Sequence, residues 1–318
     1  MAVSRQDLQA LVAPSHNDNG RTEAPDARLE RVVPFQPARA RPDLVLPNLV
    51  ARLEPESEIL WAEMQHGERA CFTPPLMRDG RNFQLHLRRL YGDGRSERLP
   101  FRYLAWTSRA KGAWSLGGDL TTFVKLIENR DREGLSAYAQ LSIDVLYDNY
   151  RALDLPLLTV AVIEGDAIGG GFEAMLTNDL VIAERQAKFG FPEILFRLFP
   201  GMGGFSFLRR KLGEAEARRL IEDGRTRSAE ELHRLGLVDV LVEPGEARAT
   251  LRRIAAEHKA RFRTDLTLKK VRHRVDPVTK SELEDIVKLW VDLALTLEAE
   301  DLRRMQALAR HQMRKRAA

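Results

Sequence analysis

The stretch from Leu157 to Gly204 places the strongest constraint on what this chain can fold into. It contains two short apolar runs, Leu157–Ile163 and Leu180–Ala183, which are rich in β-branched residues and nearly free of charge. Such runs are typical of strands that are buried on both faces of a parallel sheet. Each run is followed by a turn and then by an acidic residue near the start of a predicted helix. The stretch therefore predicts two consecutive strand-to-helix junctions of one α/β sheet, the place where ligands bind in open α/β folds.

Both junctions carry a carboxylate beside an unusual backbone. Three glycines at 169–171 precede a run of helix formers that includes Glu173. Because glycine has no Cβ, backbone N–H groups at such a helix start are open to a polarised oxygen, with the positive end of the helix dipole behind them. At the second junction Pro192 suits the first helical position and places Glu193 in the first turn. Two carboxylates beside a polarised carbonyl can move protons on and off neighbouring carbons.

A further pair of glycines, at 117–118, precedes another predicted helix. By itself such a pair indicates only a turn. A carbonyl oxygen held by backbone donors needs two of them, so we expect Leu116 or Gly117 to supply the donor that complements Gly170. The expected substrate pocket is completed by residues near the two junctions and one tryptophan far along the chain: Gly169, Gly171, Phe172, Phe191, Met202 and Trp290.

Composition limits the class of protein. With 318 residues and 44% apolar content, the chain is long enough to bury one large core. The single cysteine, Cys71, excludes an internal disulfide and a cysteine-rich metal site, and its apolar context favours a core position. No apolar run reaches the roughly eighteen residues of a membrane span, and the N-terminus lacks a secretory pattern. We therefore expect a cytoplasmic protein that needs no metal or redox cofactor.

The charge balance argues against nucleic acid as a partner. The formal net charge is +4 and the isoelectric point is near 9.3, but acidic and basic residues are intermixed through most of the chain. Such a mixture is typical of a solvated surface. The small basic excess is better interpreted as an aid in meeting an acidic partner.

We expect three regions along the chain. Residues 1–48 are rich in proline and arginine and lack periodicity, which predicts a flexible arm with a short helix near Gln6–Val12. Residues 49–260 form the core, and residues 261–318 form a helical C-terminal region. Trp290 lies on an apolar stripe of that last region. Helix packing is the plainer interpretation of this stripe, and closure of an acyl pocket by Trp290 is the alternative.

Strands and helices are predicted to alternate through the core. Strands are expected at Ile59–Met64, Ala70–Phe72 and Phe101–Trp106, and helices at Pro75–Leu90 and Gly134–Leu153. This alternation indicates parallel strands with right-handed crossovers, and hence an α/β fold.

Rival chemistries lack their patterns. The residues around Ser206 miss the second glycine of a nucleophile elbow. No Walker loop is present, Gly165–Gly171 does not keep dinucleotide spacing, and no His-Glu-x-x-His pair exists for zinc. The plain alternative is that Glu173 and Glu193 are ordinary surface acids. Their apolar context favours function instead, because desolvation raises the pKa of a carboxyl group toward neutrality.

Three motifs together resemble the signature of the crotonase, or enoyl-CoA hydratase/isomerase, superfamily. They are AIGGGFE at Ala167–Glu173, KFGFPE at Lys188–Glu193 and FPGMGG at Phe199–Gly204, and the resemblance covers roughly residues 55–260. It implies a crotonase-like spiral core of repeated ββα turns. It also implies a helical C-terminal region that makes contacts in a homotrimer or other homo-oligomer and covers the acyl pocket.

The same resemblance implies roles for individual residues. By motif position the oxyanion hole takes its N–H donors from Gly170 and Leu116, with the neighbouring Gly117 as the other option. Glu173 and Glu193 occupy the positions of the two catalytic glutamates of the hydratases. Glu193 is the preferred base and Glu173 the preferred acid, although the sequence alone leaves the exchanged roles open.

Within the superfamily the chain is most similar to the diffusible signal factor synthases of bacterial quorum sensing. The similarity is carried by LGGDL at Leu116–Leu120, by Val162–Glu173 and by Phe189–Phe196. It implies dehydration of a 3-hydroxyacyl thioester of acyl carrier protein to the cis-2-enoyl form, followed by hydrolysis to the free fatty acid signal. It also implies a regulatory sensor protein as a partner. Candidate contacts for the acidic carrier are Arg109, Lys111, Arg209, Arg210 and Lys211.

Two other functions stay open at this point. One is an enoyl-CoA hydratase or isomerase that acts on acyl-CoA and releases no free acid. The other is a crotonase-fold scaffold that binds a partner without turnover, against which the presence of both glutamates argues.

Overall fold

The computed structural model describes residues 42–92 and 99–317. The predicted helix near Gln6–Val12 lies outside the described residues. The first strand, β1 (Leu44–Leu46), pairs with β2 (Leu49–Glu54), so regular structure begins inside the segment that the sequence assigned to the arm.

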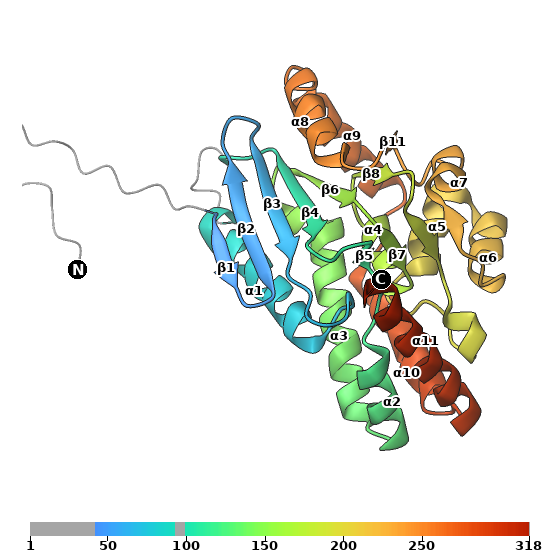
Figure 1. Ribbon diagram of the computed structural model, residues 1–318. Coiled ribbons are helices and arrows are strands. Elements are labelled where there is room, and N and C mark those ends of the chain that lie inside the picture. Colours follow the sequence, from blue (N-terminus) through green and yellow to red (C-terminus); the bar gives the residue numbers. More distant parts are fainter. Residues whose placement is uncertain (1–41, 93–98, 318) are drawn as a thin grey trace, which may run out of the picture. The chain divides into compact units, whose positions relative to one another are not determined.

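A seven-stranded sheet organises the fold, in the order β1-β2-β3-β4-β6-β8-β11 (Figure 1). Its first three strands are antiparallel and its last five are mutually parallel. The remaining strands are β3 (Ile59–Met64), β4 (Tyr103–Ser108), β6 (Leu158–Ile163), β8 (Leu180–Glu184) and β11 (Val240–Val242). The predicted parallel α/β arrangement is therefore confirmed for the centre of the sheet, with an antiparallel hairpin at one edge.

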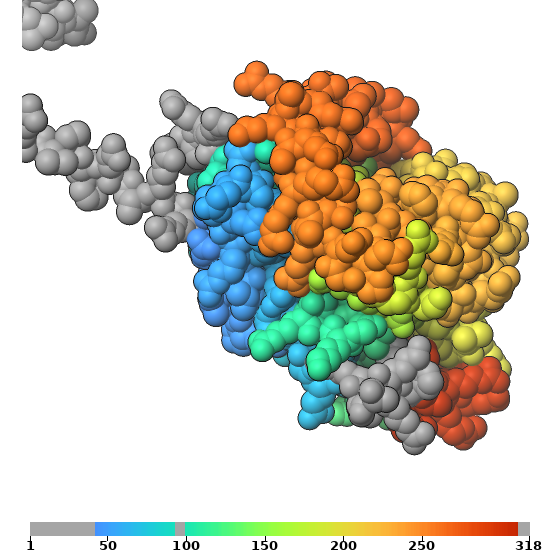
Figure 2. All heavy atoms as spheres, turned by 45° about the horizontal axis from the view of Figure 1, so that its top comes forward, coloured from blue at the N-terminus to red at the C-terminus, as the bar shows by residue number. Residues whose placement is uncertain are grey.

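Both faces of this sheet are covered, which explains the uncharged strands. Alternate residues such as Leu60 and Leu104 face α1 (Pro74–Tyr91) and α3 (Arg132–Tyr150), while their neighbours face α8 (Ala247–Glu257) and α9 (Phe262–Val275). Figure 2 shows the orange segment that contains α8 lying against the blue N-terminal strands. Ion pairs from α8 to β2 and β3 add to this packing.

A second, four-stranded sheet positions the loops at the site. Its order is β10-β9-β7-β5, with β5 (Ala113–Ser115), β7 (Asp166–Ile168), β9 (Lys188–Gly190) and β10 (Arg227–Ser228). The strands β5, β7 and β9 are mutually parallel, and each is three residues long. Each leads into a helical element near the site, namely α2 (Leu120–Glu128), α4 (Gly170–Leu176) and the single 3-10 turn η2 (Glu193–Phe196).

The predicted strand at Ala70–Phe72 is wrong. Only Phe72 makes an isolated bridge, to Gly118, because the chain turns at once into α1, where Thr73 caps the first turn and prolines follow.

The rest of the chain is mainly helical. The short η1 (Ala152–Asp154) connects α3 to β6. After the second junction come α5 (Gly204–Leu212), α6 (Glu214–Glu222) and α7 (Ala229–Arg234). The last two helices are α10 (Lys280–Ala294) and α11 (Ala299–Ala317), and Figure 1 shows them beside α2 and α3. Within residues 42–92 and 99–317, no helix is long and apolar enough to cross a membrane.

Candidate active site

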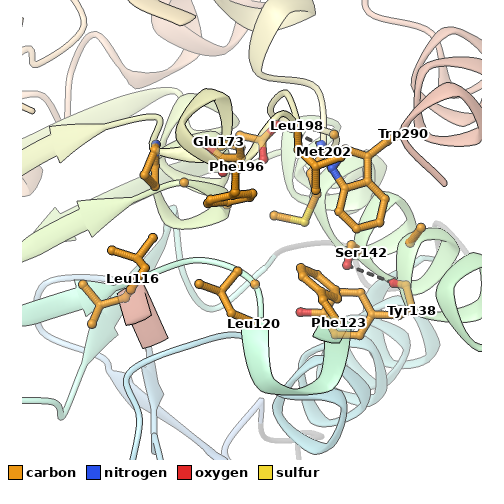
Figure 3. A pocket seen from close by; sticks show the side chains of 18 residues that line it. Leu116, Leu120, Phe123, Tyr138, Ser142, Glu173, Phe196, Leu198, Met202 and Trp290 are labelled. Atoms are coloured by element: carbon orange, nitrogen blue, oxygen red, sulfur yellow. Dashed lines mark hydrogen bonds between the residues drawn. The ribbon is translucent and has the colours of Figure 1, made fainter. Parts of the chain in front are cut away.

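A cavity lies where the two predicted junctions meet α2, α3 and the last two helices. Its volume is about 50 Å³, room for a few water molecules. Figure 3 shows Glu173, Met202 and Trp290 on one side and Leu116, Leu120 and Phe123 on the other. The lining residues are Leu116, Gly118, Leu120, Phe123, Tyr138, Ala139, Ser142, Gly169, Gly170, Glu173, Pro192, Glu193, Phe196, Leu198, Gly201, Met202, Trp290 and Leu308.

Glu173 is held rigidly at one end of the cavity. It belongs to α4, in which every residue is buried. Its Oε1 accepts hydrogen bonds from the backbone N–H groups of Met202 and Gly204, each at 2.8 Å. Burial raises the pKa of Glu173 to about 7, and the two hydrogen bonds act in the opposite direction. The Glu173 carboxyl group therefore titrates near neutral pH, and two backbone N–H groups are in place to stabilise its ionised form.

Glu193 has a different environment. It begins η2, and its Oε2 is buried without a hydrogen-bond partner among the residues that the structure describes. Burial, followed in size by the nearby charge of Glu173, raises the pKa of Glu193 to about 8. Because the two carboxyl groups repel each other when both are ionised, the pair holds one proton near neutral pH. That proton resides preferentially on Glu193, which has the higher pKa and only its own backbone N–H to stabilise its anion, whereas two N–H groups stabilise that of Glu173.

The two backbone donors that the sequence placed near the second glycine pair are already occupied. The N–H of Leu116 donates to the carbonyl oxygen of Ala70 at 2.6 Å, and that of Gly117 lies 3.3 Å from Ser115 Oγ. Leu116 lines the cavity with its side chain, whereas Gly117 does not line it. These residues therefore do not supply the second donor in this structure.

The next residue fits that role. The N–H groups of Gly118 and Gly170 have no acceptor among the described residues, and both glycines line the cavity. They are close neighbours, since a Cβ placed on Gly170 would lie 3.4 Å from the nitrogen of Gly118. The positive φ of Gly117, +87°, turns the chain so that this approach is possible. The sequence had indicated the two residues just before Gly118 for this role.

Three other expected pocket residues, Gly169, Met202 and Trp290, do line the cavity. The terminal methyl of Met202 lies against Gly170, where an added Cβ would be 2.2 Å from Cε. The flexible Met202 side chain therefore occupies the space beside the Gly170 Cα that a side chain would need.

Gly171, Phe172 and Phe191 lie beside the cavity but do not line it. Phe172 and Phe191 stack on each other with ring centroids 4.7 Å apart and form the core beneath the junctions. Gly171 packs on the backbone of Ser115. Contrary to expectation, these three residues do not line the cavity, because the two aromatic rings bury each other and Gly171 packs against backbone.

Sequence reasoning missed the apolar wall from α2, α3 and α11. Phe123 packs against Tyr138 and Trp290, with ring centroids 4.8 and 5.1 Å away. The Tyr138 hydroxyl donates to the carbonyl oxygen of Phe72 and accepts the N–H of Asp119 at 3.3 Å. The only sequence pattern at these residues was the spacing of apolar side chains along one side of each helix. That pattern does not distinguish a cavity wall from ordinary core.

Cys71 is buried, and burial raises the pKa of its thiol to about 12. It is therefore a core residue and a poor nucleophile. In the described ranges no cluster of three or more histidine, cysteine or acidic residues is arranged to hold a metal ion.

Comparison with known proteins places the chain in a family. The family model described as enoyl-CoA hydratase/isomerase matches residues 104–305. The fatty acid oxidation complex subunit alpha of Pseudomonas aeruginosa is 34% identical over 158 residues, which make up 48% of this chain and 22% of that protein. The peroxisomal fatty acid beta-oxidation multifunctional protein MFP2 of Arabidopsis thaliana is 36% identical over 148 residues, 46% of this chain and 20% of that protein. The matched segment thus spans about a fifth of these curated relatives.

Solved structures agree over most of the chain. A putative enoyl-CoA hydratase from Streptomyces avermitilis superposes with a TM-score of 0.67 at 21% identity, covering 85% of this chain and 92% of that one. DspI from Pseudomonas aeruginosa superposes with a TM-score of 0.62 at 26% identity, covering 80% of this chain and 98% of that one. The fold is that of the crotonases, and the chain belongs to the enoyl-CoA hydratase/isomerase family.

Proposed function

We propose that this protein dehydrates a 3-hydroxyacyl thioester of acyl carrier protein to the cis-2-enoyl form and then hydrolyses the thioester, releasing a free unsaturated fatty acid signal. One observation carries the chemistry. Two unoccupied N–H donors, on Gly118 and Gly170, line the same cavity as two carboxyl groups that share a proton. Similarity to DspI and the LGGDL motif at Leu116–Leu120 support the signal-synthase branch.

The backbone donors carry the first step of the proposed mechanism. The thioester oxygen accepts hydrogen bonds from the N–H groups of Gly118 and Gly170. These bonds stabilise the negative charge that develops on the oxygen when C2 loses a proton. The loss of one such donor typically costs about 3 kcal/mol of transition-state stabilisation. The positive end of the α4 dipole lies behind Gly170 and adds to this effect.

The environments of the two carboxyl groups favour roles opposite to those preferred from the sequence. Glu173 is supported as an anion by Met202 and Gly204, so it takes the C2 proton. Glu193 carries the shared proton and gives it to the departing 3-hydroxyl, which leaves as water. For hydrolysis, an ionised glutamate removes a proton from water while the water oxygen bonds to the thioester carbon. The same two N–H groups hold the tetrahedral oxyanion. As this intermediate collapses, its C–S bond breaks and the protonated glutamate returns its proton to the departing sulfur, which leaves as the thiol.

The carrier is the second element of the proposal. Gln65, His66, Arg109 and Lys111 line a cleft of about 320 Å³, formed by the segments that follow β3 and β4. Arg109 donates a hydrogen bond to Gln65 Oε1 at 3.0 Å. Neither Arg109 nor Lys111 forms an ion pair with a described residue, so both charges are available to an acidic carrier. On α5, by contrast, Arg210 pairs with Glu282 and Asp276, and Arg209 lies 3.7 Å from Asp276. We therefore propose Arg109 and Lys111, rather than the α5 residues, as carrier contacts.

Assembly into a homo-oligomer is also proposed. The helix α9 exposes three apolar side chains along one side, Leu268, Val271 and Val275, and a row of this kind is typical of a protein–protein contact. A regulatory sensor protein remains an expectation from the motif resemblance.

The proposal is tested by the products. The purified protein is incubated with medium-chain 3-hydroxyacyl carrier protein and, separately, with the matching acyl-CoA, and products are identified by mass spectrometry and proton NMR. Free cis-2-enoic acid from the carrier thioester is the expected result. A thioester-bound trans-enoyl product alone would assign the protein to the acyl-CoA hydratases, which the two β-oxidation relatives favour. No product from either thioester would leave only the scaffold interpretation.

A further inference from the structure

We propose that an ion pair between Arg197 and Asp301 positions Glu193, by fixing the turn that carries this residue against the C-terminal helix α11. The inference concerns two residues outside the cavity wall and rests on the proposed function of Glu193 as a proton donor. Arg197 and Asp301 are positioning residues, because neither lines the cavity.

The turn η2 has few restraints of its own. It is a single 3-10 turn between Pro192 and Arg197, and its outer residues Ile194 and Leu195 are 40% and 56% exposed. Its inner residues, Glu193 and Phe196, line the cavity. Because Glu193 Oε2 has no hydrogen-bond partner among described residues, the position of this carboxyl group depends on the backbone of the turn.

Arg197 closes that turn in an uncommon conformation. Its φ of 60° and ψ of 29° lie in the left-handed region, which L-residues with a side chain adopt rarely. The conformation lets the next residue, Leu198, donate its N–H to the carbonyl oxygen of Glu193 at 3.0 Å. A non-glycine residue in this conformation indicates that surrounding contacts maintain it.

The contact that does so comes from α11. The side chain of Asp301 is 1% exposed, and its Oδ1 lies 3.3 Å from Arg197 Nε. Its other oxygen, Oδ2, accepts the N–H of Glu298 at 3.1 Å and thereby fixes the start of the helix. A buried carboxylate requires a cation nearby, and Arg197 is the cation that the structure places there. Arg304 adds a weaker link, from its Nη1 to the carbonyl oxygen of Leu195 at 3.5 Å.

The same helix reaches the cavity. Leu308 lies two turns after Asp301 and lines the wall, while Met305 between them is fully buried. Release of the Asp301 end would therefore loosen η2 and admit water beside Glu193. The charged and titratable groups around Glu193 are Glu173 on α4, Tyr138 on α3, Arg197 at the end of its own turn, and Asp301 and Arg304 on α11.

Two variants test the pair from its two sides. Asp301→Asn keeps the size of the side chain and an oxygen for the Glu298 N–H, and Arg197→Gly removes the guanidinium while keeping a residue suited to the left-handed conformation. Asp292→Asn is the matched control, because it breaks the exposed Arg132–Asp292 pair between α3 and α10, away from the cavity. Circular dichroism checks that all three variants fold.

We expect both test variants to lower kcat by between about tenfold and hundredfold, as a displaced catalytic group does, with KM nearly unchanged. The alkaline limb of the pH profile, where Glu193 loses its proton, should move to lower pH by about one unit because water now reaches the carboxyl group. Arg197→Lys, which keeps a cation, should recover part of both effects. A normal pH profile in Asp301→Asn and Arg197→Gly would overturn the proposal.

Hydrogen exchange tests the pair independently of any substrate. Backbone amides of 193–198 should exchange faster in Asp301→Asn than in the wild type or in Asp292→Asn. Unchanged exchange in this segment would also overturn the proposal, even if the protein turned over no thioester. Faster exchange in a protein without thioester activity would uphold the ion-pair inference while the proposed function failed.

Discussion

The two junctions that carry the carboxyl groups are built in different ways. The first enters α4, where every residue is buried and where Glu173 receives two N–H groups. The second enters the half-exposed turn η2, where Glu193 has a buried oxygen without a partner. In the proposed mechanism the same amino acid is a supported anion at the first junction and a proton donor at the second. The backbone around each carboxyl group, rather than the residue type, sets its role.

The largest effect should come from removing either carboxyl group. Glu173→Gln keeps an oxygen for the Met202 and Gly204 N–H groups but cannot accept a proton, and Glu193→Gln cannot deliver one. Each change should lower kcat by about 10²- to 10⁴-fold. Steady-state assays with the carrier thioester measure this, with the exposed surface residue Glu230→Gln as control. Near-normal turnover in either variant would remove that carboxyl group from the mechanism.

The rigidity of the first junction can be broken at Gly171. An added Cβ would lie 2.2 Å from the carbonyl oxygen of Ser115, a backbone atom that cannot move aside. We expect Gly171→Ala to lower the free energy of unfolding by about 3 kcal/mol, the upper range for overpacking. Gly67→Ala is the control, because nothing lies within 4 Å of its Cβ position. Urea denaturation compares the two, and equal midpoints would show that the junction adapts easily.

The cost of burying Glu193 should appear as pH-dependent stability. The folded-state pKa of about 8 lies above the usual value of 4.5. Below pH 4.5 the residue is protonated in both states, and as the pH rises toward 8 only the unfolded state ionises, so folding loses stability. Glu193→Gln removes this loss. The free energy of unfolding of the variant should exceed that of the wild type at pH 8.5 by about 4 to 5 kcal/mol and match it at pH 4. Equal stability at both pH values would contradict the burial argument.

The smallest predicted effect separates the roles of the two groups. Activity should rise as Glu173 ionises near pH 7 and fall as Glu193 deprotonates near pH 8, which gives a narrow bell. In Glu193→Gln the alkaline limb should disappear, and the residual kcat/KM should still rise through the remaining acid limb. Residual activity that falls with rising pH would instead assign Glu173 as the acid.

The sequence predicted the long elements of the fold well. The strand at Ile59–Met64 has the expected bounds, and the helix expected at Pro75–Leu90 is found at Pro74–Tyr91, because such lengths give periodicity enough positions to be visible. The three-residue strands β5, β7 and β9 were not predicted. A strand of that length has no recognisable period, and only its tertiary partners define it.

The site was predictable where side chains carry the chemistry. Glu173 and Glu193 were chosen for their place after bends in apolar sequence, and the structure brings both to one cavity. The second backbone donor could not be chosen from the sequence, since every residue but proline has an N–H group and only the structure shows that the one of Leu116 is bonded to Ala70. The Arg197–Asp301 pair joins residues 104 positions apart, so no local pattern could have indicated it.

The central claim is that the N–H groups of Gly118 and Gly170 polarise a thioester carbonyl between the two carboxyl groups. Infrared difference spectroscopy tests it directly, with a carbonyl-¹³C-labelled 3-hydroxyacyl thioester bound to the inactive Glu193→Gln protein. We predict that the carbonyl stretch of the bound thioester shifts to lower frequency than in water. The shift should shrink in the double variant that adds Gly117→Ala, where the new Cβ would lie 2.7 Å from the nitrogen of Gly170. A bound thioester whose carbonyl frequency equals that in water would contradict the account.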